Sequence, residues 1–226
     1  MAMMLYGVIR AVIFDLDGTL VHSLSGIAHA LNTTLERNQL PTHAEEKVRT
    51  FIGDGITMLV KRACPDSYQD GQIIALTDQV SAEYATAWQK GTRPYPEVSE
   101  TLKTLLDHGI KIAVLSNKPH AFCEKMTDFI FPDIPFTTVV GQHHGAPTKP
   151  DPTSALNLAN LLELRPEEIA FVGDSTIDIV TARRAGMTSI AATWGYHDLA
   201  HLVSECPDYR IDQISELVQI LNINAN

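Results

Sequence analysis

The sequence has few cysteines and no cysteine pair with the spacing of a metal site. Its three cysteines, Cys64, Cys123 and Cys206, are widely separated along 226 residues, and no Cys-x-x-Cys occurs. An odd number of scattered cysteines argues against a disulfide framework and against a zinc site. We therefore expect a protein of the reducing cytoplasm.

An excess of positive charge is also missing. The chain has 17 Lys and Arg against 27 Asp and Glu, for a formal net charge of −10. This balance predicts no nucleic-acid partner and no binding to an anionic membrane. Any phosphate that the protein binds must meet a local positive site or a metal.

Long apolar runs, internal repeats and low-complexity tracts are absent as well. No stretch approaches the roughly 20 apolar residues of a membrane helix. Residues 1–10 are apolar but short, and they lack an early basic region, so we interpret them as the lead-in to a first strand and not as a signal peptide. With 45% hydrophobic and 19% charged residues, the chain is an ordinary globular protein of one large or two small domains.

One stretch, residues 12–20, combines a short apolar run with two acids. Val-Ile-Phe leads directly into Asp15, and Asp17, Gly18 and Thr19 follow. The run predicts a buried strand that ends in a tight loop. Two carboxylates at such an end are costly unless a cation or a proton separates them, and hard oxygen ligands suit Mg²⁺. The ordinary alternative is a polar loop with two solvated acids; the adjoining backbone N–H groups and threonine hydroxyl, which can bind an anion, argue against it.

From residue 22 to about residue 92, apolar residues recur at helical spacing. Gly53-Asp54-Gly55 is predicted to be a tight loop between two of the helices, and no strand is predicted in this segment. The four apolar stripes are Ile27, Leu31 and Leu35; Val48, Phe51 and Ile52; Ile56, Leu59, Val60 and Ala63; and Ile73, Leu76, Val80, Tyr84 and Trp88.

Beyond this segment, predicted strands alternate with predicted helices. The strands are 111–115, 136–141, 168–173, 188–192 and 209–211, and the helices are 98–108, 120–130, 152–164, 177–185 and 214–221. This alternation predicts an α/β fold with a doubly wound, Rossmann-like parallel sheet. Because a parallel crossover needs only about a dozen residues, we interpret residues 22–93 as an inserted helical cap domain. The core domain is then formed by residues 1–21 and 94–226.

Polar groups follow four of the predicted strands, where ligands bind in open α/β sheets. Each group alone has an ordinary explanation as a helix cap or a solvated turn. Together, three acids, one lysine and several hydroxyl or amide donors suit Mg²⁺ and a phosphoryl group. The four groups are Asp15 to Thr19, Ser116 with Asn117, Lys149, and Gly173-Asp174-Ser175 with Asp178 one helical turn further on.

In this order, the four groups resemble the four motifs of the haloacid dehalogenase superfamily. The helical insert directly after the first motif resembles the phosphatases of that superfamily that carry an α-helical cap. Further short sequence segments resemble its phosphoglycolate phosphatase branch, namely residues 51–55, 95–98, 116–119, 149–152 and 194–196.

The resemblance implies Mg²⁺-dependent hydrolysis of a small, phosphoglycolate-like phosphate monoester. Asp15 is the implied nucleophile and forms an aspartyl-phosphate, while Asp17 is the implied acid and base. An acid two residues after the nucleophile also favours phosphate chemistry over dehalogenation, because a leaving halide needs no proton.

The same resemblance implies the binding roles. Ser116 and Lys149 hold the transferring phosphoryl oxygens, with help from Gly18, Thr19 and Asn117. Mg²⁺ lies on Asp15, on the backbone carbonyl of Asp17 and on Asp174. Asp178, with Ser175 beside it, is expected to orient Lys149 or the metal's waters without touching the metal.

Three positions depart from the pattern of these relatives. His22 stands where many carry Asp, and it is either a determinant of substrate preference or a surface residue at a hinge. Glu97 stands where a glycine is common, which matters only for a turn. Asp54 in the cap loop repels a substrate carboxylate unless Arg49, Lys61 or Arg62 compensates.

Two alternatives stay open. A phosphosugar mutase of the β-phosphoglucomutase type shares the fold and the aspartyl-phosphate. A phospho-acceptor receiver domain, which is not an enzyme, also gathers acids, a hydroxyl and a lysine at strand ends, but it is about half as long and has no cap. The expected partner is a small phosphorylated metabolite, and the expected assembly is a monomer or a homodimer.

Overall fold

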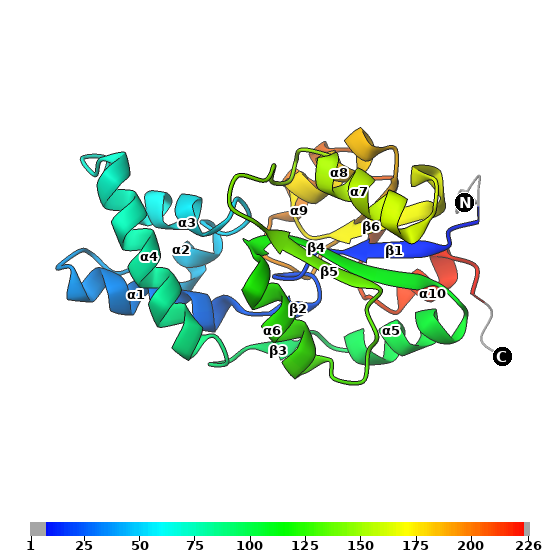
Figure 1. The fold of residues 1–226 in the computed structure, drawn as a ribbon, viewed down its shortest axis with the longest axis horizontal. Helices are drawn as coiled ribbons and strands as arrows, with labels where there is room; N and C mark the ends of the chain where they lie inside the picture. Colours follow the sequence, from blue (N-terminus) through cyan, green and yellow to red (C-terminus); the bar gives the residue numbers. More distant parts are fainter. Residues whose placement is uncertain (1–7, 224–226) are drawn as a thin grey trace.

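A six-stranded parallel sheet forms the centre of the protein, which the computed structural model describes from residue 8 to residue 223. Its strand order is β5-β4-β1-β6-β7-β8, and every neighbouring pair is parallel (Figure 1). The strands are β1 (Ala11–Phe14), β4 (Lys111–Pro119), β5 (Thr138–Gln142), β6 (Ile169–Gly173), β7 (Thr188–Ala192) and β8 (Tyr209–Ile211). The predicted α/β, doubly wound fold is confirmed.

Successive residues of the central strand β1 face opposite layers of helices. Val12 and Phe14 pack in one apolar cluster with residues of α5 (Val98–Asp107), α6 (His120–Ile130) and α10 (Glu216–Ile220). Ala11 and Ile13 pack in another, with residues of α7 (Thr153–Leu162) and α8 (Thr176–Ala185). Burial on both faces explains why these strands are continuous apolar runs.

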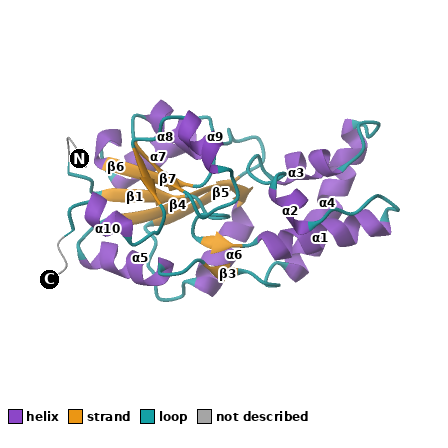
Figure 2. Ribbon diagram, turned by 180° about the vertical axis from the view of Figure 1, so that it is seen from behind, coloured by secondary structure: helices purple, strands orange, loops and turns teal. Residues whose placement is uncertain are grey.

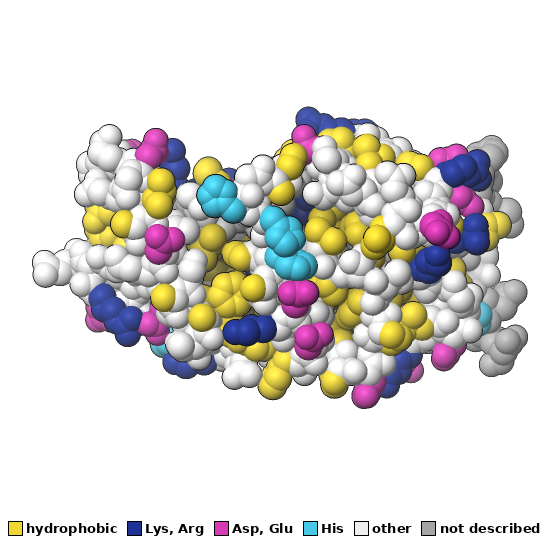
Figure 3. Space-filling view, in the orientation of Figure 1, with side chains coloured by type: hydrophobic (Ala, Val, Ile, Leu, Met, Phe, Trp, Pro, Cys, Tyr) yellow, Lys and Arg dark blue, Asp and Glu magenta, His cyan; other side chains and the backbone are white. Residues whose placement is uncertain are grey.

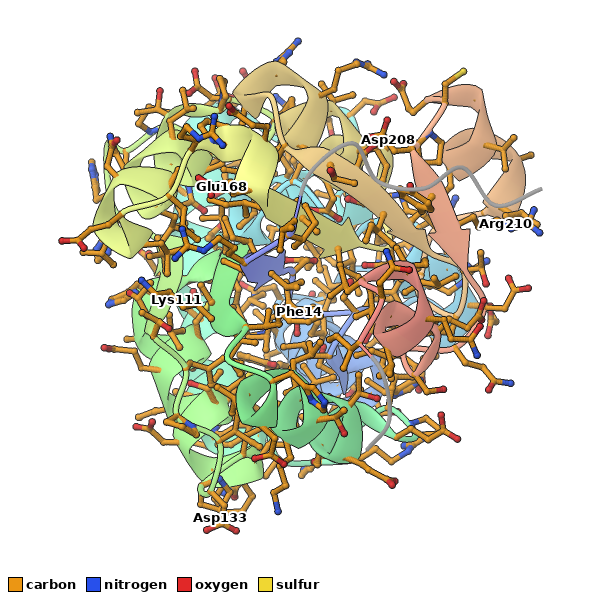
Figure 4. All side chains as sticks on the ribbon, turned by 90° about the vertical axis from the view of Figure 1, so that its right-hand side faces the viewer. Phe14, Lys111, Asp133, Glu168, Asp208 and Arg210 are labelled. Atoms are coloured by element: carbon orange, nitrogen blue, oxygen red, sulfur yellow. The ribbon has the colours of Figure 1, made fainter. Side chains whose placement is uncertain are left out.

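The two layers are visible above and below the sheet in Figure 1, and again from behind in Figure 2. Figure 4 looks at the end of the molecule away from α1–α4: Phe14 lies near the middle of the view, and the labelled charged residues lie further out. A short helix, α9 (Leu199–Ser204), packs through Leu202 against Ile179 of α8.

The segment between β1 and β4 forms a separate group of helices at one end of the sheet. These are α1 (Leu24–Arg37), α2 (Glu45–Arg49), α3 (Ile56–Ala63) and α4 (Asp70–Ala87), and they enclose their own apolar cluster. Figure 1 shows them beyond the carboxyl ends of the strands, as a cap. A two-stranded antiparallel ribbon, β2 (Val21–His22) with β3 (Arg93–Pro94), joins the group to the core at the proposed domain boundaries (Figure 2).

Several predicted elements differ from the observed ones at their ends. The strand predicted at 136–141 begins at Thr138, and the second cap helix ends at Arg49, before the two apolar residues assigned to its stripe. Strand β4 extends beyond Leu115 to Pro119, with a register shift in its pairing between those two residues. The ribbon β2–β3 and helix α9 were not predicted.

The surface in Figure 3 is indented where the cap meets the core, and acidic and basic side chains are interspersed over this face. Over residues 8–223, no helix combines the length and the apolar character that crossing a membrane requires.

Candidate active site

A cavity lies between the cap and the carboxyl ends of the central strands. It measures about 80 Å³, on a scale where one buried water needs about 10–15 Å³. It therefore suits a small molecule. The cap contributes Ile27, Ile52, Gly53, Gly55, Ile56, Leu59, Val80 and Tyr84 to its wall, and the core contributes Asp15, Asp17, Ser116, Asn117, Lys118, Pro119, Phe122, Lys149, Asp174, Ser175, Tyr196 and His197.

Asp15, directly after β1, shares a buried lysine with Asp178. The Lys149 amino group lies 2.7 Å from Asp15 Oδ1 and 2.6 Å from Asp178 Oδ1. Burial raises the pKa of Asp15 to about 6, against the opposing pull of Lys149. Burial alone lowers the pKa of Lys149, but the two carboxylates outweigh it and raise that pKa, so the lysine is a cation.

The first turn of α8 positions Asp178. Ser175 is the N-cap, and its hydroxyl donates to Asp178 Oδ2 over 2.6 Å while its backbone N–H donates to the same oxygen over 3.1 Å. Both oxygens of Asp178 are thus occupied, one by Ser175 and one by Lys149. This arrangement fits a residue that orients Lys149.

Asp174 is held from two sides. The Thr19 hydroxyl donates to its Oδ1 over 3.0 Å, and the Tyr196 backbone N–H donates to its Oδ2 over 2.7 Å. Two glycines give it room, because an added Cβ would lie 2.4 Å from Asp174 Oδ2 at Gly18 and 2.3 Å from it at Gly195. Gly18 also has a φ of +90°, which a glycine adopts readily.

Three buried carboxylates, those of Asp15, Asp174 and Asp178, offer oxygens within 4.8 Å of one another. Burial raises the pKa of Asp174 well above its ordinary value, and the neighbouring Asp15 and Asp178 carboxylates raise it further. One lysine cannot balance three acids, so the site has an excess of negative charge. Hard oxygen donors and uncompensated charge fit a divalent cation such as Mg²⁺.

Asp17 contacts residues that the sequence analysis did not single out. The Lys118 amino group donates to both of its oxygens, over 3.1 and 2.9 Å, and also to the hydroxyl of Tyr84 over 2.8 Å. The Ser23 hydroxyl donates to Asp17 Oδ1, and Ser23 in turn contacts the hydroxyl of Tyr196, with its N–H donating over 2.7 Å. Tyr84 of the cap therefore contacts the lysine partner of Asp17, and Ser23 in the hinge contacts Asp17 itself.

Asn117 ties the end of β4 to Lys149 and to the cap. Its side-chain carbonyl accepts from the Lys149 backbone N–H over 2.9 Å, and its amide donates to the Lys149 carbonyl over 3.0 Å and to the Gly53 carbonyl over 3.1 Å. Ser116 Oγ accepts from the Lys118 backbone N–H over 3.3 Å and lines the cavity. Both residues lie where the pairing of β4 with β5 is irregular.

The three departures lie outside the wall of the cavity. The His22 ring packs edge-on against Tyr95 and Tyr196 in the hinge, with centroids 5.7 and 6.1 Å away. Asp54 pairs with Arg62, so its charge is compensated within the cap. Glu97 has a φ of +61°, which explains why a glycine suits that turn.

The chain is similar to known proteins in both sequence and fold. The chain is 35% identical over 215 residues to the phosphoglycolate phosphatase of Mannheimia succiniciproducens, covering 92% of this chain and 96% of the relative. It is 33% identical to that of Aquifex aeolicus, covering 94% and 97%. A crystal structure described as a predicted phosphoglycolate phosphatase from Haemophilus somnus 129pt matches with a TM-score of 0.88 at 31% identity, over 95% of this chain and 99% of the other.

The family model described as haloacid dehalogenase-like hydrolase matches residues 12–192, which include all four motifs. The family, the fold and the enzyme class predicted from those motifs are thereby confirmed. The chain belongs to the haloacid dehalogenase-like hydrolase family.

Proposed function

We propose that the protein is a Mg²⁺-dependent phosphatase that hydrolyses a small phosphate monoester, of the phosphoglycolate type, through an aspartyl-phosphate. One observation carries the proposal. Asp15 and Asp17 line a single small cavity with Lys149, and each carboxylate has its own lysine partner. The relatives named phosphoglycolate phosphatase support the substrate class.

In the first step, the Asp15 carboxylate attacks phosphorus, and the bond from phosphorus to the ester oxygen breaks. Asp17 donates a proton to the departing oxygen, so the product is an alcohol. In the second step, Asp17 removes a proton from water as the water oxygen attacks phosphorus. Phosphate leaves, and the Asp15 carboxylate is restored.

The transferring phosphoryl oxygens are held by Ser116 and Lys149, with Gly18, Thr19 and Asn117 assisting. Lys149 also offsets the repulsion between Asp15 and a phosphate dianion, in a cavity where burial strengthens such interactions. Asp178 and Ser175 position Lys149 through the hydrogen bonds described above.

Asp15 and Asp174, with the Asp17 carbonyl, are the proposed ligands of Mg²⁺. When bound, the ion supplies positive charge that balances the buried acids and the phosphoryl group. The apolar cap wall closes over the substrate and excludes water. The free state of Cys64, Cys123 and Cys206 is in keeping with a cytoplasmic location.

Phosphate release from a panel of small esters, including 2-phosphoglycolate and sugar phosphates, tests the proposal. We expect release with Mg²⁺, none with EDTA, and none from Asp15→Asn in either condition. Isomerisation of a sugar phosphate without net release would instead identify the mutase. A folded wild type that releases phosphate from no ester would contradict the phosphatase proposal.

A further inference from the structure

Lys118 is the one lysine of the cavity wall that does not bridge Asp15 and Asp178. Of the described residues that form this wall, two are lysines and none is an arginine. Lys149 lies between two carboxylates, whereas Lys118 pairs with Asp17 alone. We propose that Lys118, with the Tyr84 hydroxyl, binds a second anionic group of the substrate, a carboxylate next to the ester carbon, and so selects acidic over uncharged phosphate esters. This inference rests on the proposed phosphatase function and identifies the substrate class of the same site.

The three cap cations that the sequence offered for this task, Arg49, Lys61 and Arg62, are occupied elsewhere. Lys61 does not line the cavity and lies 3.7 Å from Asp70. Arg62 pairs with Asp54 and donates to the Phe51 carbonyl over 2.9 Å. Arg49 donates to the Tyr196 carbonyl and lies 3.5 Å from Asp198. Neither arginine lines the cavity. His197 does, but burial lowers the pKa of its ring, which disfavours the charged form, so a second negative charge on the substrate has Lys118 as its cationic partner.

The position of Lys118 suits a carboxylate attached one carbon from the ester oxygen. In the proposed reaction that oxygen lies within hydrogen-bond distance of Asp17, about 3 Å. The Lys118 amino group is 2.9 and 3.1 Å from the two Asp17 oxygens. In 2-phosphoglycolate the carboxyl carbon is two bonds from the ester oxygen. With its ester oxygen hydrogen-bonded to Asp17, the substrate would therefore place its carboxylate within hydrogen-bond distance of the Lys118 amino group, which itself lies one hydrogen bond from Asp17.

The hydrogen-bonding capacity of Lys118 also fits this role. An ammonium group has three N–H donors, and their acceptors here are the two Asp17 oxygens and the Tyr84 hydroxyl. A substrate carboxylate can replace one Asp17 oxygen without leaving any donor unpaired. Tyr84 belongs to helix α4 of the cap, so the complete subsite forms only when cap and core are together.

The rest of the cap wall strengthens the selection. Apart from Tyr84, the cap side chains that line the cavity are aliphatic and provide no second charged partner, namely Ile27, Ile52, Ile56, Leu59 and Val80, and Phe122 of the core helix α6 adds a further apolar surface. The Lys118 side chain is 6% exposed. A charge pair in such surroundings is stronger than the same pair in water.

The test compares two esters that differ only in this group. In 2-phosphoglycolate the ester carbon carries a carboxylate, and in ethyl phosphate it carries a methyl group. We expect wild type to favour 2-phosphoglycolate in kcat/KM, and Lys118→Gln to reduce that preference by about 10- to 100-fold, mainly through KM. Tyr84→Phe, a milder change that keeps the ring, should reduce it about threefold. Lys125→Gln, on the exposed side of α6, is the matched control and should leave both rates unchanged.

Equal losses on both esters in Lys118→Gln would overturn the proposal, because they would mean that Lys118 acts only by positioning Asp17. A wild type with no preference for the carboxylate would overturn it as well. Calorimetric binding of both esters to Asp15→Asn, with and without Lys118→Gln, separates this inference from the proposed function. If wild type hydrolyses neither ester, a Lys118-dependent preference in binding still supports the subsite, and no preference overturns it.

Discussion

At the scale of single residues, Gly195 decides how closely the loop after β7 approaches the acid cluster. A Cβ at this position would lie 2.2 Å from Asp174 Cβ, and Thr19 and Tyr196 hold the Asp174 carboxylate in place. We expect Gly195→Ala to lower the free energy of unfolding by about 1–3 kcal/mol through overpacking, and to weaken Mg²⁺ binding. Urea denaturation with and without Mg²⁺ measures both effects.

Gly71 provides the matched control for that substitution. It lies in helix α4, and a Cβ there would meet no atom within 4 Å. Gly71→Ala should leave Mg²⁺ binding unchanged and leave stability unchanged or slightly raised, because alanine favours a helix. If Gly195→Ala and Gly71→Ala changed stability and Mg²⁺ binding equally, close packing against Asp174 would not explain why a glycine stands at position 195.

A second residue-scale prediction follows from the three buried acids, Asp15, Asp174 and Asp178. Without a metal, burial and the repulsion of Asp15 and Asp178 disfavour the ionised Asp174 carboxylate. We therefore expect Asp174→Asn to raise the melting temperature in EDTA and to lose the further rise that Mg²⁺ gives wild type. That rise reflects about 2.7 kcal/mol at 100 times the Kd. Thermal unfolding in EDTA and in Mg²⁺ is the measurement.

Asp133→Asn is the control for the acid cluster, because Asp133 is exposed, does not line the cavity and lies at the edge of the molecule in Figure 4. It should melt like wild type in both conditions. An Asp174→Asn variant that is still stabilised by Mg²⁺ to the wild-type extent would remove Asp174 from the proposed metal ligands.

At the scale of elements, the strands and their order along the chain could be predicted because each depends on its own apolar run. Residues 188–192 and 209–211 are strands over the predicted ranges. The two-residue strands β2 and β3 could not be predicted, since their pairing joins residues some 70 positions apart and neither carries an apolar run. Helix α2 ends at Arg49, and the loop that follows it contacts the core through the Gly53 carbonyl, a tertiary contact that the local apolar pattern does not contain.

The residues of the site likewise fall into those that the sequence predicts and those that only the structure reveals. Asp15, Asp17 and Asp174 follow the ends of β1 and β6, so topology brings them together, whereas Lys149 lies in the loop after β5 and is held in place by the Asn117 side chain. Tyr84 belongs to a helical apolar stripe, and nothing in that stripe shows that its hydroxyl contacts Lys118. Residues 194–196 resemble the phosphoglycolate phosphatase branch, but nothing in that short segment shows that the Tyr196 hydroxyl accepts from the Ser23 N–H.

The hinge between core and cap gives an element-scale prediction. The Tyr196 hydroxyl accepts from the Ser23 N–H over 2.7 Å and lies 3.2 Å from the Ser23 hydroxyl, which contacts Asp17. We expect Tyr196→Phe to lower kcat about tenfold, with a smaller change in KM, because Asp17 loses its support. Steady-state kinetics on the best ester is the measurement. Tyr68→Phe, in the cap away from the cavity, should be silent; equal effects would indicate a general loss of stability.

At the scale of the whole molecule, hydrogen bonds join the cap to the core around the cavity and the hinge. Asn117 donates to the Gly53 carbonyl, Lys118 to the Tyr84 hydroxyl, and Arg49 to the Tyr196 carbonyl. The apolar clusters also cross the boundary: Ala30, Tyr84 and Trp88 of the cap segment pack with the core, and Tyr196 of the core packs with the cap. Entry of a substrate into this enclosed cavity requires these contacts to open.

Arg49 therefore offers a way to alter closure without touching the cavity. It reaches from α2 of the cap to the Tyr196 carbonyl and to Asp198 of the core. We expect Arg49→Gln to raise KM severalfold with little change in kcat, because the open form is favoured but the closed site is intact. Small-angle scattering should show a larger radius of gyration.

Arg37→Gln is the matched control, since Arg37 pairs with Glu83 within the cap. If Arg37→Gln raised KM as much as Arg49→Gln, the effect would lie in cap stability, and an unchanged KM in both would mean that this contact does not hold the cap closed.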